Sequence, residues 1–130
     1  TTNGTSAAYN TTSDGRLKNT NVQQRNYRST IEKLWVGDFK WKKDGSAGFG
    51  IVAQQAFFLF PEAVSKPADE RKIWQADYSK LAPLALWGVK DLYKMEDRKS
   101  ILISAQSNEI ADLKRRLAKL EARIEYAPIK

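Results

Sequence analysis

The sequence contains neither cysteine nor histidine. Without cysteine there is no disulfide and no thiolate metal site, and the redox compartment cannot be inferred. Without histidine, the Ser-His-Asp and Cys-His catalytic arrangements are excluded. A hydrolase made from these residues must therefore depend on lysine, carboxylates or hydroxyls, as in a Ser-Lys or paired-carboxylate site. We expect no metal and no cofactor.

The sequence also lacks long hydrophobic runs. No apolar stretch approaches the roughly 20 residues that span a bilayer, and the polar N-terminus does not resemble a signal peptide. The 130 residues are 42% hydrophobic and 28% charged, which is the size and composition of one ordinary soluble domain. We therefore expect no membrane partner.

Basic residues outnumber acidic ones and give a net charge of +7, which suggests a possible nucleic-acid partner. The excess is spread thinly along the chain. Its densest cluster, Lys114-Arg115-Arg116, lies among acidic neighbours at helical spacing, which is typical of a solvated helix face. We expect no nucleic-acid partner, and a basic coiled-coil nucleic-acid binder is the least favoured alternative.

Hydrophobic spacing and turn residues predict an α+β fold with a short helix and a small antiparallel sheet. The apolar spacing within 20–35 predicts the short helix. The sheet is expected around Trp35, Phe39, Trp41 and Trp74, with a tight turn at Asp44-Gly45. Further along, residues 53–60 predict one or two helical turns ended by Pro61, and residues 62–78 predict a hairpin. Phe57, Phe58 and Phe60 are expected to pack against the sheet or a neighbouring chain.

A long helix is expected over residues 78–127, with Pro83 tolerated in its first turn. Its C-terminal half carries heptads, whose apolar positions we call the heptad seam: Ile103, Ile110, Leu113, Leu117, Leu120 and Ile124. Parallel packing would bring Glu109 opposite Lys114 and Arg116 opposite Glu121 of the next chain, and both pairs are opposite in charge. The seam predicts self-association but does not fix the number of chains. A lone amphipathic helix packed on its own domain is the alternative.

Three short motifs occur in a fixed order along the chain. Residues 13–18 read SDGRLK, residues 50–54 and 60–64 read GIVAQ and FPEAV, and residues 77–81 read DYSKL and lead into the long helix. Together they resemble the self-cleaving intramolecular chaperone domain at the C-termini of phage endosialidases, tail fibres, tail spikes and neck appendages. The chain differs from that family's pattern at Gly48, where many members have histidine.

The resemblance implies a chaperone domain over residues 13–130, with residues 1–12 as the C-terminal end of an upstream fibre stalk. It implies a homotrimer that folds a triple-stranded β-helical stalk of the same polypeptide during virion assembly in the host cytoplasm. The released chaperone is then expected to be absent from the mature virion or only loosely held on it. A non-catalytic trimerisation cap is the alternative function.

The resemblance also implies one self-cleavage of the Thr12–Ser13 bond, with Ser13 as nucleophile and Lys18 as its activator. The chemistry is consistent with these residues, because a serine hydroxyl can attack the preceding carbonyl through a five-membered ring at a large proximity advantage. A lysine acts as a base near neutral pH only when burial or a cationic neighbour lowers its pKa. Asp14 and Arg16 are expected to support the dyad, Arg16 through charge repulsion.

Overall fold

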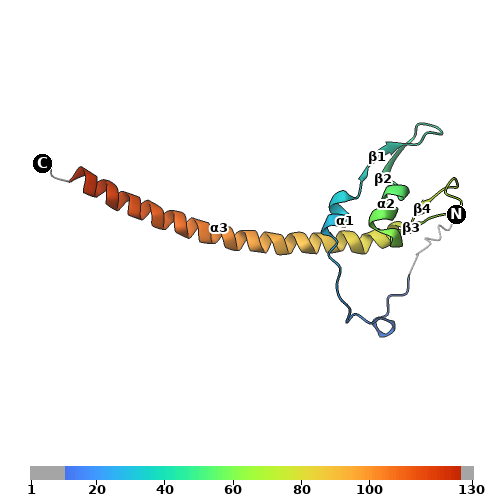
Figure 1. The fold of residues 1–130 in the computed structure, drawn as a ribbon, viewed down its shortest axis with the longest axis horizontal. Helices are drawn as coiled ribbons and strands as arrows, with labels where there is room; N and C mark the ends of the chain where they lie inside the picture. Colours follow the sequence, from blue (N-terminus) through green and yellow to red (C-terminus); the bar gives the residue numbers. More distant parts are fainter. Residues whose placement is uncertain (1–10, 127–130) are drawn as a thin grey trace, which may run out of the picture.

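The computed structural model describes residues 11–126 as a small head at one end of a single long helix (Figure 1). The head contains six short elements, and the long helix follows it. In chain order these are α1 (Arg28–Lys33), β1 (Val36–Lys40), β2 (Ala47–Ile51), α2 (Ala53–Leu59), β3 (Val64–Ser65), β4 (Gln75–Ala76) and α3 (Leu81–Glu125). Three 3-10 turns accompany them: η1 (Gly15–Leu17) precedes α1, η2 (Pro61–Ala63) joins α2 to β3, and η3 (Tyr78–Lys80) joins β4 to α3. The predicted α+β class is confirmed. No helix among residues 11–126 has an apolar stretch long enough to cross a membrane.

The first hairpin forms where alternating aromatic and polar residues meet a glycine turn. Strands β1 and β2 are antiparallel, with Val36 opposite Ile51 and Phe39 opposite Gly48. Gly45 has a φ of 72° in the connecting turn, a conformation that glycine adopts without steric cost. Strands β3 and β4 pair separately, so the expected single sheet is in fact two two-stranded sheets.

The short helix begins later than expected within residues 20–35. α1 starts at Arg28, whose backbone N–H donates to the Asn26 side chain. The preceding residues from Thr20 to Asn26 are exposed and form no helix, because an amphipathic segment this short needs a surface to pack against.

The long helix also begins a few residues later than residue 78. Asp77 caps η3 by accepting hydrogen bonds from the Ser79 backbone N–H at 3.0 Å and from its hydroxyl at 2.6 Å. α3 then runs for 45 residues from Leu81, or about 68 Å at 1.5 Å per residue. Pro83 lies in its first turn, as expected. The predicted end at Ala127 lies outside the described residues.

The core of this single chain is small. Among residues 11–126 the buried apolar residues are Ala56, Phe60, Ala63 and Leu84, with Tyr27, Ile31 and Leu81 packed partly against them. The chain exposes 12251 Å², whereas a compact folded chain of 14.8 kDa exposes only about 7000 Å². The single chain therefore exposes much more surface than a compact domain of the same mass.

Candidate Ser-Lys cleavage site

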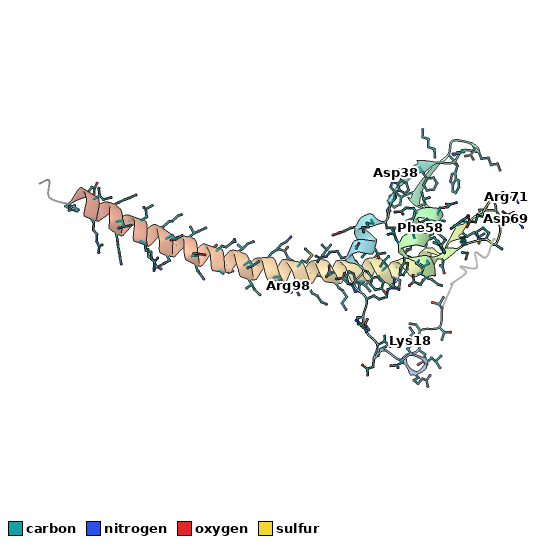
Figure 2. The ribbon with its side chains drawn as sticks, in the orientation of Figure 1. Lys18, Asp38, Phe58, Asp69, Arg71 and Arg98 are labelled. Atoms are coloured by element: carbon teal, nitrogen blue, oxygen red, sulfur yellow. The ribbon has the colours of Figure 1, made fainter. Side chains whose placement is uncertain are left out.

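The motif at residues 13–18 lies on an extended segment that loops away from the head. We call residues 11–27 the strap. The strap runs on the opposite side of α3 from the β1–β2 hairpin, and η1 forms its turn (Figure 1). Figure 2 labels Lys18 on this loop, well separated from Phe58 in the head.

The local fold of the strap explains why the two ends of the motif meet. The Asp14 side chain accepts a hydrogen bond from the Arg16 backbone N–H at 2.9 Å and caps η1. The N–H of Lys18 donates to the carbonyl of Gly15 at 3.2 Å and closes the turn. Lys18 then leaves the turn in an extended conformation. One turn of chain therefore returns residue 18 to the neighbourhood of residue 13.

The two expected catalytic side chains are in direct contact. Lys18 Nζ donates a hydrogen bond to Ser13 Oγ at 2.7 Å. This is within the range required between a nucleophile and its base. When the amine is neutral, the same contact lets Nζ accept the hydroxyl proton. The scissile bond predicted from the sequence, Thr12–Ser13, lies directly beside this contact.

Asp14 and Arg16 form an ion pair with each other within the motif. Arg16 Nε is 3.0 Å from both carboxylate oxygens of Asp14, and Nη2 is 2.5 Å from one of them. These hydrogen bonds hold the pKa of Asp14 below its usual value. The guanidinium charge is thus directed at a carboxylate, so the pair stabilises the turn that joins Ser13 to Lys18.

Ser13 and Lys18 are both exposed in the single chain. Burial is the most effective way to lower the pKa of a lysine amine, and a water-excluded site also strengthens electrostatic stabilisation of a tetrahedral intermediate. The geometry of the dyad is therefore formed within one chain, but a dry environment for it is not. Within residues 11–126 no group of three or more side chains has the composition of a metal site.

The second and third motifs meet in the head. The backbone N–H of Ile51 donates to the Tyr78 hydroxyl at 3.1 Å, which joins β2 to η3. A Cβ atom at Gly50 would overlap that hydroxyl, so glycine is required for this contact. The N–H of Asp77 donates to the carbonyl of Ala63 at 2.7 Å. These motifs shape the head rather than the dyad.

Sequence reasoning missed the contacts that attach the strap to the head. Arg25 forms an ion pair with Glu62 of η2, and its hydrogen bond is the main reason why the pKa of Glu62 lies below its usual value. Glu62 belongs to the FPEAV motif, whose likeness to the family gave the only signal. No periodicity links two residues that are 37 positions apart.

The heptad seam is unpartnered in the single chain. Its six residues are between 52% and 76% exposed, and α3 continues far beyond the head (Figure 1). In the basic cluster, Arg115 and Arg116 each form an ion pair with Asp112 of the same helix, as expected for a solvated helix face. Phe58 is 82% exposed, whereas Phe57 and Phe60 pack against Trp74 and Tyr27.

Comparison with known families agrees with the motifs. Residues 13–65 match the model of a family described as chaperone of endosialidase, and that family carries a peptidase name. This match supports the endosialidase-type chaperone domain that the motifs resemble. It supports a chaperone role and a peptidase-type domain. No curated protein matches the chain.

Proposed function

We propose that this chain is an intramolecular chaperone that trimerises, folds an upstream phage fibre or spike stalk, and then cuts itself free between Thr12 and Ser13. The observation that carries the proposal is the 2.7 Å contact between Lys18 Nζ and Ser13 Oγ within a match to the endosialidase chaperone family. The exposed heptad seam supports the assembly step, because an apolar stripe on an isolated helix is stable only against a partner.

The proposed cut is an N-to-O acyl shift followed by hydrolysis. The neutral Lys18 amine removes the Ser13 hydroxyl proton as Oγ attacks the carbonyl carbon of Thr12. The C–O bond forms, the Thr12–Ser13 C–N bond breaks, and the protonated lysine delivers the proton to the departing nitrogen. Water then opens the ester, which leaves the Thr12 carboxylate and restores the Ser13 hydroxyl.

Assembly would gate this reaction, because the dyad is exposed in one chain. A neighbouring chain that covers the strap would exclude water and lower the pKa of an enclosed lysine. Cleavage would then follow correct trimer formation. A non-catalytic trimerisation cap is the second candidate, and the exposure of both dyad residues favours it.

The test is intact mass spectrometry and N-terminal sequencing of the assembled protein after long incubation. We expect loss of residues 1–12 and a new N-terminus at Ser13. Ser13→Ala and Lys18→Ala should abolish the cut, whereas Lys43→Ala, an exposed lysine in the β1–β2 turn, should leave it unchanged. Hydroxylamine should trap the ester as a hydroxamate on Thr12. Cleavage at another bond, or cleavage that persists in Ser13→Ala, would disprove the assignment.

A further inference from the structure

The strap is attached to the head near its C-terminal end. Residues 15–26 are all exposed, and Tyr27 is the first half-buried residue after them. The side-chain hydrogen bonds of Lys18, Asn19 and Gln24 stay within the strap. The contacts that fix the strap relative to the head must therefore lie close to Arg25 and Tyr27.

Arg25 and Tyr27 form a compact cluster with Phe60 and Glu62. The Arg25 guanidinium forms an ion pair with Glu62 and lies 4.8 Å from the centre of the Tyr27 ring and 5.9 Å from that of Phe60. The Tyr27 ring packs edge to face against Phe60 and Trp87, at 6.0 and 5.5 Å between ring centres. Phe60 in turn is a core residue, only 9% exposed. The cluster thus joins the strap to the buried core of the head.

The geometry points to Arg25 and Glu62 as residues that position the strap for cleavage of the Thr12–Ser13 bond. This role rests on the proposed function. Tyr27 holds the chain at one point on the core. Arg25 supplies a second point two residues earlier, and two points fix the direction in which the strap leaves the head. Because the dyad must meet another chain to be buried, that direction decides whether Ser13 and Lys18 reach the covering surface.

An exposed ion pair alone contributes little, but two features strengthen this one. The stacked guanidinium adds cation–π attraction at two rings, and both rings are already held by the core. Loss of the pair should therefore redirect the strap while the head remains folded. Small misplacements of reacting groups reduce rates by up to about 100-fold, so we expect Glu62→Gln to slow cleavage by about tenfold.

The first measurement is the rate of the Thr12–Ser13 cut. Glu62→Gln and Arg25→Gln should each slow it, and the exchanged pair Arg25→Glu with Glu62→Arg should recover part of the loss. Glu70→Gln is the matched control, because Glu70 forms a similar exposed pair with Lys66 away from the strap. Rates for Glu62→Gln equal to those of Glu70→Gln would overturn the proposal. So would an exchanged pair that recovers nothing.

The second measurement does not depend on cleavage. Since the chain has no cysteine, spin labels can be placed at Leu17→Cys and Lys90→Cys in a Ser13→Ala background, with labelled chains diluted in unlabelled ones. Glu62→Gln should broaden the distance distribution between the labels, and Glu70→Gln should not. An unchanged distribution would overturn the positioning role even if the wild type cuts. A broadened one would support it even if the wild type does not cut.

Discussion

The Tyr78 hydroxyl lies directly over Gly50, so any side chain at position 50 would collide with it. We expect Gly50→Ala to lower the free energy of unfolding by about 1–3 kcal/mol, because the added methyl displaces the hydroxyl. Tyr78→Phe should cost about 1 kcal/mol through loss of the hydrogen bond from Ile51. The double variant should cost less than the sum, since both changes break one contact.

Chemical denaturation at a fixed protein concentration measures these differences. Gly15→Ala is the control, because nothing lies within 4 Å of a Cβ at that position. Strict additivity of Gly50→Ala and Tyr78→Phe would show that the two residues do not interact.

Gly48 shows how a departure from the family pattern is accommodated. A Cβ at this position would lie 2.5 Å from the Phe39 ring, and Phe39 is its partner across the hairpin. The ring therefore covers the position at which many family members have histidine. A larger side chain here would require Phe39 to move.

At the level of elements, local signals predicted most of the fold. Gly45 marked the hairpin turn and Pro61 marked the end of α2, because each signal is local. The Ser13–Lys18 dyad was predicted from the resemblance of the SDGRLK motif to the family, not from its spacing. The Arg25–Glu62 and Ile51–Tyr78 contacts join positions 37 and 27 residues apart. Such pairs have no periodicity and cannot be read from one sequence. The helix predicted within residues 20–35 begins only at Arg28, because apolar spacing does not reveal that residues 20–26 have no surface to pack against.

Helix α3 provides the test of the heptad seam. Leu117→Asp should abolish the proposed trimer, because a buried charge without a partner costs several kcal/mol. Ala122→Asp adds the same charge on the same helix but outside the seam, so it should leave association largely intact. Sedimentation equilibrium distinguishes the two variants. A wild-type domain that sediments as a stable monomer at all concentrations would contradict the assembly model.

At the level of the whole molecule, the prediction concerns the upstream stalk. An intertwined three-chain β stalk depends on non-local pairing and must bear a large loop-closure cost before its contacts form. A domain that trimerises first brings the stalk ends to about millimolar effective concentration and aligns their register. We therefore expect a parent fibre that lacks residues 13–130 to misfold and aggregate.

The measurement is the yield of soluble native fibre with and without residues 13–130, together with unfolding half-lives of the wild type and Ser13→Ala. The cut fibre should unfold more slowly than the uncut one. Without residues 13–130, its chains cannot unfold by simply reversing the assembly step, so the barrier to unfolding is higher. Equal yield from the truncated gene would show that the domain is not a chaperone for that fibre.

For the proposed trimer, the exposed outer part of α3 should make the stability of the domain depend on protein concentration. In the proposed trimer, a helix about 68 Å long that begins in a head whose largest buried side chain is Phe60 would gain most of its stability from other copies of itself. Its melting temperature should therefore rise with protein concentration, as for any fold whose native state is an oligomer. In the proposed nascent fibre the three chains would be held together at high local concentration, so the domain would be stable during assembly. If the domain is cut free and diluted as proposed, the same dependence should favour dissociation, and the released domain should become a loosely folded monomer that proteases degrade.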